Sequence, residues 1–316
     1  MMAQIERAVG IDCGKKSLDV ALSHSKDIIR VTNDAAGLQE LLGWVGTHDV
    51  RRVGLEATGG YERRARDELT KAGYAVQVFD PSRVRYFAKA KGRRAKSDPI
   101  DAAVIAEFTA FTPETDAVAI DSAREELAGL VRTRAGLADR RADLVKMRAT
   151  AVEAAWPDLD ALIEHHNVTI LSIEAKIKSR VAANAKFGKT ADALQTAPGI
   201  GFVTAVSIVA MLPELGHLAG GKISALVGVA PFDRDSGQFH GQRHIAGGRA
   251  DLRKALYMAT MVAATRTKGV INEFYRRLIA AGKKPKVALV ACMRKMAVRL
   301  NAMLASGSTW QEQPER

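Results

Sequence analysis

Residues 7–23 read RAVGIDCGKKSLDVALS, and this stretch decides the fold of the first part of the chain. Two apolar runs, 7–12 and 17–23, flank a short Gly14-Lys15-Lys16 turn, which predicts a β-hairpin. A third short strand is predicted at 27–31. These three strands open an α/β domain, because helical and strand patterns alternate after them.

The alternation continues to about residue 111. A helix is predicted around 38–45, a strand at 52–56, a helix at 61–72, a strand at 75–80 and a helix from Asp98. Three strands followed by alternating helices and strands is the element order of a ribonuclease-H-like domain, although other α/β folds share it. We assign this domain to residues 1–118.

The next part of the chain has a different pattern. Leu130, Leu137 and Leu144 recur every seven residues, and Pro157 interrupts the helical run before it resumes. This predicts a coiled-coil hairpin over 119–186, acting as a spacer or dimer arm. A mainly helical domain rich in glycine and bases is expected over 187–306, and a flexible tail over 307–316.

Composition narrows the class of protein. The 316 residues are enough for about two domains, and the net charge of +12 favours a polyanionic partner such as nucleic acid. Two distant cysteines, Cys13 and Cys292, indicate free thiols in a reducing compartment. The N-terminus lacks an apolar leader, and no apolar run approaches the ~20 residues of a membrane helix, so we expect a cytoplasmic protein without membrane contact.

Four acidic residues stand at positions suited to metal binding. Asp12 and Glu56 end predicted strands, whereas Asp98 and Asp101 start a predicted helix on one face of its first turn. Two magnesium ions that catalyse phosphoryl transfer require converging carboxylates, because hard cations prefer oxygen ligands. We therefore interpret the four residues as a Mg²⁺ site, because acids at the ends of buried strands need a cationic partner.

Each acid also has an ordinary structural alternative. Asp98 before Pro99 is a good helix N-cap, and Asp12 before Gly14 can shape a turn. Glu56 can simply begin a strand-to-helix loop. Residues 12–18 are also compatible with the phosphate-binding hairpin of actin-like sugar kinases, but no well-placed glycine-rich adenosine site follows.

Positive charge is concentrated in two acid-free runs. Residues 276–299 contain eight bases, and residues 82–97 contain seven bases with Tyr86 and Phe87 among them. The seven bases are Arg83, Arg85, Lys89, Lys91, Arg93, Arg94 and Lys96. Such a run is commonly a solvated face, but beside candidate metal ligands it favours binding of a phosphodiester substrate.

A Pro198-Gly199-Ile200-Gly201 turn resembles the hairpin of helix-hairpin-helix modules. In those modules the backbone N–H groups of the turn and a helix N-terminus face a DNA phosphate. Gly199 and Gly201 are therefore candidate nucleic-acid contacts. An ordinary helix–helix turn is the alternative.

Ser236 lies in a polar, glycine-rich loop that precedes a predicted helix. Its neighbour Gly237 lets the backbone approach a ligand closely. Arg243, Arg249 and Arg253 follow and are candidates to clamp a phosphate. Ser236 is a candidate nucleophile, with a simple turn as the alternative, because nothing in the sequence shows which base activates it.

Several motifs occur in one order along the chain. They are Gly10-Ile11-Asp12, Glu56-Ala57-Thr58-Gly59, Lys96-Ser97-Asp98-Pro99-Ile100-Asp101-Ala102, Pro198-Gly199-Ile200-Gly201, Ser236-Gly237 with Gly248-Arg249 and Leu252-Arg253, and Gly282-Lys283-Lys284-Pro285-Lys286. Together they resemble the DEDD-type insertion-sequence transposases, which are bridge-RNA-guided recombinases with a RuvC-like N-terminal domain and a C-terminal transposase domain. The resemblance spans about residues 9–304.

The resemblance implies a mechanism and partners. The four carboxylates would bind two Mg²⁺ ions, and Ser236 would form a covalent serine–DNA intermediate. A homo-oligomer (dimer or tetramer) would act on donor and target DNA with a noncoding guide RNA. Two alternatives remain: a RuvC-like, metal-dependent, structure-specific DNA nuclease, and a nucleic-acid-binding protein without catalytic activity.

Overall fold

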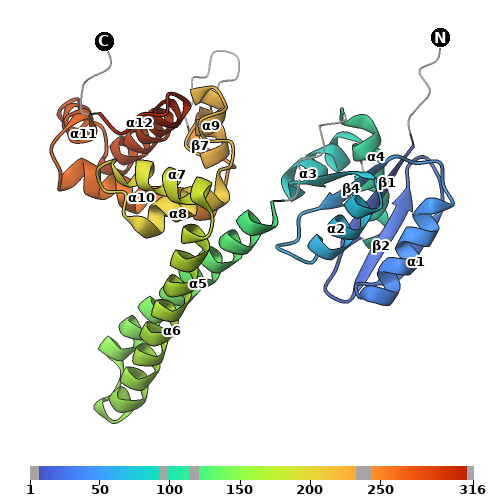
Figure 1. Cartoon of the computed structure of the whole chain (residues 1–316), viewed down its shortest axis with the longest axis horizontal. Coiled ribbons are helices and arrows are strands. Elements are labelled where there is room, and N and C mark those ends of the chain that lie inside the picture. Colours follow the sequence, from blue (N-terminus) through green and yellow to red (C-terminus); the bar gives the residue numbers. More distant parts are fainter. Residues whose placement is uncertain (1–6, 93–97, 114–120, 233–243, 312–316) are drawn as a thin grey trace. The chain divides into compact units, whose positions relative to one another are not determined.

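The computed structural model of the chain describes residues 7–92, 98–113, 121–232 and 244–311, with the backbone alone over 98–100 (Figure 1). The chain divides into two compact units, Met1–Ile120 and Asp121–Arg316. The first is a mixed α/β unit, and the second is almost entirely helical.

A five-stranded sheet forms the centre of the first unit, with strand order β3-β2-β1-β4-β5. The strands are β1 (Ala8–Cys13), β2 (Ser17–Leu22), β3 (Ile28–Thr32), β4 (Arg52–Glu56) and β5 (Ala75–Phe79). β2 pairs antiparallel with both β1 and β3, whereas β1, β4 and β5 pair in parallel. The predicted hairpin and all five predicted strands are confirmed within one or two residues at each end.

Helices cover both faces of this sheet. They are α1 (Ala35–Gly46), α2 (Arg63–Lys71), α3 (Pro81–Ala90) and α4 (Asp98–Phe111). Leu41 of α1 and Leu69 of α2 share a core with Val9, Ile11 and other strand residues. Phe79 of β5 packs instead with residues of α3 and α4. The sequence did not predict α3, which occupies the first half of the basic run.

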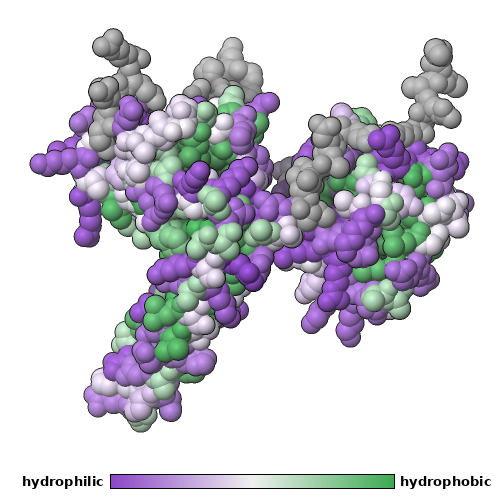
Figure 2. All heavy atoms as spheres, viewed as in Figure 1, coloured by the Kyte–Doolittle hydropathy of each residue, from purple (hydrophilic) through white to green (hydrophobic). Residues whose placement is uncertain are grey.

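The second unit begins with a helical hairpin of α5 (Ser122–Thr150) and α6 (Trp156–Ala182), joined through the short 3₁₀ helix η1 (Glu153–Ala155). Proline lies in the first turn of α6, where its missing N–H costs nothing. At the base of the hairpin, Leu127 and Ile177 enter the main core of the unit. Leu171 of α6 is 64% exposed. Figure 2 shows green, hydrophobic patches along the surface of the hairpin.

The other helices of this unit, α7 to α12, contribute to one hydrophobic core. They are α7 (Ala185–Gln195), α8 (Phe202–Met211), α9 (Gly220–Val227), α10 (Ala250–Thr265), α11 (Val270–Ala280) and α12 (Pro285–Ala305). Every residue of α8 from Ala205 to Met211 is buried, which places this helix at the centre. In the part of the chain that is described, none of the helices combines the length and the apolar character needed to cross a membrane.

Candidate functional site

The parallel pairing of β1 and β4 brings two of the predicted ligands to the same edge of the sheet. Ile11 pairs with Leu55, so the next register position sets Asp12 beside Glu56. Side chains alternate between the faces of a strand, and Asp12 therefore lies on the face of Gly10, as Glu56 lies on the face of Gly54. This is the face that α4 covers.

Two glycines allow α4 to approach that face closely. Gly10 and Gly54 are register partners on β1 and β4. A Cβ at Gly10 would overlap the backbone of Ala102 and Ala106, and a Cβ at Gly54 would overlap the side chain of Thr109. Asp101 directly precedes Ala102, so this packing fixes the first turn of α4 near the ends of the two strands.

The charges of these acids influence one another. Burial, followed by the like charges of Asp12 and Asp101, raises the pKa of the Glu56 carboxyl, and Arg85 offsets part of this shift. Burial and the carboxylates of Asp12, Glu62 and Glu56 likewise raise the pKa of the Cys13 thiol. Cys13 is accordingly a buried free thiol, as is Cys292 in the second unit.

The donor set suits a hard divalent cation. Asp12, Glu56 and Asp101 offer only carboxylate oxygens, and a cation between them would relieve the repulsion that adds to the effect of burial on the pKa of Glu56. The backbone of Asp98 starts α4, but its side chain lies outside the described residues. Among the described side chains, no three acidic, histidine or cysteine groups already converge at metal-binding distance.

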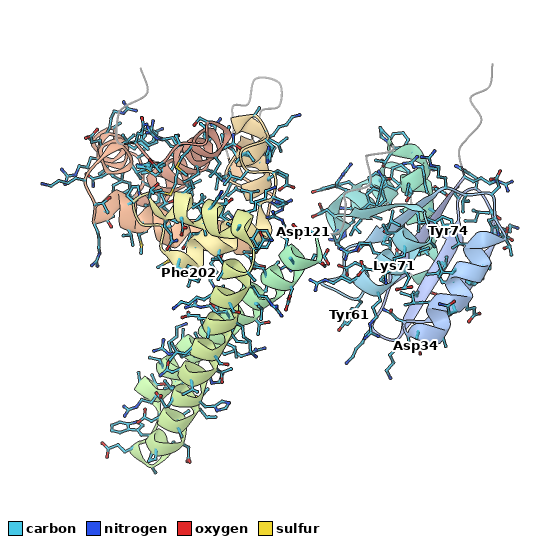
Figure 3. The ribbon with its side chains drawn as sticks, in the orientation of Figure 1. Asp34, Tyr61, Lys71, Tyr74, Asp121 and Phe202 are labelled. Carbon is cyan, nitrogen blue, oxygen red and sulfur yellow. The ribbon has the colours of Figure 1, made fainter. Side chains whose placement is uncertain are left out.

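Asn33 ties together the two loops that follow the carboxylate strands. Its side-chain Nδ2 donates hydrogen bonds to the carbonyl of Gly14 at 2.9 Å and to the carbonyl of Tyr61 at 3.0 Å. Gly14 lies two residues beyond Asp12, and Tyr61 lies in the loop after β4. Tyr61 and the neighbour of Asn33, Asp34, lie at the same end of the unit (Figure 3).

Glu62 orders the loop after Glu56 from within. Its Oε2 accepts hydrogen bonds from the Thr58 hydroxyl at 2.8 Å and the Gly60 N–H at 2.8 Å. Burial opposes ionisation of Glu62, but these hydrogen bonds outweigh it and lower its pKa. Asn33 and Glu62 were not predicted from the sequence, because their partners are groups of the loops, most of them backbone.

Asp80 is a further acid at this edge that the sequence interpretation missed. It follows β5, the parallel neighbour of β4, and its negative charge also raises the pKa of Glu56. The Asp80 side chain caps α3 by accepting hydrogen bonds from the backbone N–H and the hydroxyl of Ser82, which lower its pKa. The strand-end argument used for Asp12 and Glu56 would have found it.

The described bases of the run 82–97 fall into two groups, those with a contact inside the unit and those that are exposed. Lys91 forms an ion pair with Glu107 of α4 at 2.6 Å, and Arg83 lies over the Phe108 ring at 5.5 Å. Arg85 and Lys89 are exposed on α3. The other three predicted contacts, Arg93, Arg94 and Lys96, lie outside the described residues.

The glycine turn of the second unit joins α7 to α8. Gly199 has φ +78°, and a Cβ there would overlap the carbonyl of Ala259 on α10. Packing against α10 is therefore sufficient reason for glycine at this position. Gly201 is exposed and caps the N-terminus of α8. Phosphate binding by both glycines stays a prediction.

Ser236 and Arg243 lie outside the described residues, in the part of the sequence between β6 (Pro231–Phe232) and β7 (His244–Ile245). The two short strands pair antiparallel. Their pairing brings the ends of the Ser236 segment together.

The other two predicted arginine contacts are occupied within the unit. Arg249 forms a two-pronged ion pair with Glu214, with distances of 2.7 and 2.6 Å, and donates a third hydrogen bond to the carbonyl of Met211. Arg253 donates to the carbonyl of Gly247 at 2.7 Å. Both arginines thus hold the segment that follows the Ser236 loop, and their contact with phosphate stays a prediction.

Comparison with known proteins agrees with this arrangement of two parts. Residues 9–157 match a family model for the DEDD transposase domain of IS110 elements, and residues 191–276 match the transposases of the IS116/IS110/IS902 family. The chain carries two IS110-family transposase domains. The DEDD transposase domain contains all four predicted carboxylates, and the second domain contains Ser236 with its three arginines.

Two relatives of the chain have names that describe an activity. Pilin gene-inverting proteins of Moraxella lacunata and Moraxella bovis are each 26% identical to the chain over 307 residues. The similarity covers 91% of this chain and 92% of each relative. It therefore extends across both transposase domains and the hairpin.

Proposed function

We propose that the chain is a site-specific DNA recombinase that cuts and rejoins strands through a covalent serine–DNA intermediate. Asp12, Glu56, Asp98 and Asp101 would hold the divalent metal, with Mg²⁺ as the expected ion and two ions as the expected number. A bound divalent cation supplies charge neutralisation of phosphoryl oxygens. The observation that carries the proposal is the meeting of β1, β4 and α4, which gathers three of these acids at one sheet edge.

Ser236 is the proposed nucleophile. Its Oγ attacks the scissile phosphorus, a phosphoserine ester forms, and one DNA strand leaves with a free hydroxyl. Attack by the hydroxyl of another strand on the same phosphorus restores a phosphodiester and releases the serine. The ester retains the energy of the original bond, so ATP is not needed. Support comes from the position of Ser236 within the second transposase domain.

The relatives favour strand rejoining over simple hydrolysis. Both are named for inverting a pilin gene, and inversion of a DNA segment requires that cut ends be joined again. We extend this requirement to the present chain. The RuvC-like form of the first domain is supported by its strand order β3-β2-β1-β4-β5, with β2 alone reversed. Guidance by a noncoding RNA and assembly into a homo-oligomer belong to the same proposal.

Strand exchange by the purified chain tests the proposal. The full-length protein is incubated with Mg²⁺, with RNA transcribed from the DNA flanking its own gene, and with plasmids carrying donor and target junctions. We expect recombinant plasmid from the native chain and none from Ser236→Ala or Asp12→Asn.

Three results would contradict the mechanism. Recombination by Ser236→Ala at the native rate would exclude a covalent serine intermediate. Metal-dependent cutting without rejoining would favour a nuclease. Unchanged strand exchange by Asp12→Asn would show that the carboxylate site is not needed for the reaction.

A further inference from the structure

The exposed face of α3 carries an aromatic ring beside two positive charges. Helical geometry places Arg85, Tyr86 and Lys89 within about one third of the helix circumference. All three side chains are exposed, and Tyr86 has 68% of its surface in solvent. Val84 is buried on the opposite side and holds the helix to the rest of the unit.

Tyr86 differs from the aromatic residue next to it. Phe87 packs its ring against Phe108, with 5.1 Å between the ring centroids. Tyr86 is turned away from that cluster, so packing within the unit does not account for a large aromatic side chain there. α3 contains three bases and no acid, and its charge therefore complements a phosphate backbone.

The position of α3 links this face to the carboxylates. Phe79, the last residue of β5, is the register partner of Glu56, and Asp80 then caps α3. Arg85 lies close enough to Glu56 for its charge to act on that carboxyl. A strand of nucleic acid lying along Arg85 and Lys89 would thus lead directly to the edge of the sheet where Asp12 and Glu56 meet.

We propose that Tyr86 stacks on a base of an unpaired stretch of DNA next to the scissile phosphate. Arg85 and Lys89 contact the phosphates of the same strand. An aromatic ring on a basic face fits unpaired DNA, since bases of an intact duplex already stack on one another and are not free to stack on protein. This proposal rests on the proposed function in one respect: it takes the bound strand to continue to the carboxylate site, where the DNA is cut.

A fluorescence experiment on the full-length chain tests the stacking. Tyr86→Trp keeps an aromatic ring and introduces an indole at this position. The probes are a 20-nucleotide DNA strand, its blunt duplex and an RNA strand of the same sequence. We expect the DNA strand to quench the extra fluorescence of Tyr86→Trp over the native chain, and the duplex and the RNA to quench it much less.

Affinity measurements supply the second readout. Tyr86→Leu should weaken binding of the DNA strand by about fivefold or more, whereas duplex binding changes by less than about twofold. Phe111→Leu is the matched control, because Phe111 is 74% exposed on α4, a helix without any Lys or Arg. We expect it to bind like the native chain, and thermal unfolding verifies that both variants fold.

The outcomes that would overturn the stacking proposal differ from those that would overturn the proposed function. Equal quenching by duplex or RNA, absence of quenching, or native DNA affinity in Tyr86→Leu would overturn the stacking proposal. The same measurements are repeated with Asp12→Asn, which keeps α3 intact. Quenching by DNA in that background supports stacking even if the recombination mechanism fails.

Discussion

Gly10 on β1 and Gly54 on β4 lie side by side in register, and α4 rests on both. Because the helix touches the sheet backbone here, the acid at its first turn lies near the acids that end the two strands. The carboxylate site thus depends on two residues that carry no functional group.

Substitution of Gly10 should separate the helix from the sheet. In Gly10→Ala the added methyl overlaps α4 backbone that cannot move alone, so we expect a loss of about 1–3 kcal/mol or more in the free energy of unfolding. Gly43→Ala is the control, because its Cβ meets nothing within 4 Å on the exposed side of α1, and helix propensity favours alanine by up to about 1 kcal/mol. The free energy of unfolding is compared by thermal unfolding. A comparable loss of stability in both variants would contradict this role of Gly10.

The raised pKa of Glu56 predicts how stability depends on pH without metal. The folded chain keeps the Glu56 proton at pH values where the unfolded chain has lost it, so the free energy of unfolding falls as pH rises to the folded pKa. Glu56→Gln removes this cost. We expect the variant to unfold at a higher temperature than the native chain at pH 7.5, with the difference shrinking at pH 4. A constant difference would show that ionisation of Glu56 is not responsible.

Asn33 should act on the proposed metal site through the two loops that it joins. Asn33→Ala removes the donor to the carbonyls of Gly14 and Tyr61. We expect Mn²⁺ affinity to fall by about 10- to 100-fold, as for other residues that support metal ligands. Ser25→Ala removes a hydrogen bond to Asp27 at the opposite end of the sheet and should leave Mn²⁺ affinity unchanged. Equal affinities in calorimetric titrations of both variants would exclude the positioning role.

Arg249 and Glu214 should act as one structural pair. Their side chains are about one third exposed, so we expect either Arg249→Ala or Glu214→Ala to cost only about 1 kcal/mol of stability. Both variants release the segment after the Ser236 loop and should lose strand exchange to a similar extent. Loss of strand exchange in Arg249→Ala but not in Glu214→Ala would instead identify Arg249 as a phosphate contact, as the sequence suggested.

Local patterns in the sequence were sufficient for much of the first unit. Apolar alternation around Gly14 predicted the hairpin, and acids at strand ends predicted that Asp12 and Glu56 meet. α3 was missed because its bases were interpreted as a charge run, although Asp80-Pro81 is the same helix-start signal that identified Asp98-Pro99.

Contacts between distant residues could not be predicted in this way. Asn33 binds carbonyls 19 and 28 residues away, and Arg249 binds a carboxylate 35 residues away. Neither pair has a characteristic spacing, since each depends on how the strands or helices pack. The exposure of Tyr86 likewise became evident only from the structure, in which the neighbouring Phe87 packs against Phe108.

Mn²⁺ binding by the full-length chain, measured by isothermal titration calorimetry, tests the carboxylate site most directly. The compared variants are Asp12→Asn, Glu56→Gln and Asp101→Asn, with Glu68→Gln on the surface of α2 as the control. We predict that the native chain and the control bind Mn²⁺ alike and that each of the three variants loses at least about tenfold in affinity. Equal Mn²⁺ affinity in all five proteins would contradict a metal site at the edge where β1, β4 and α4 meet.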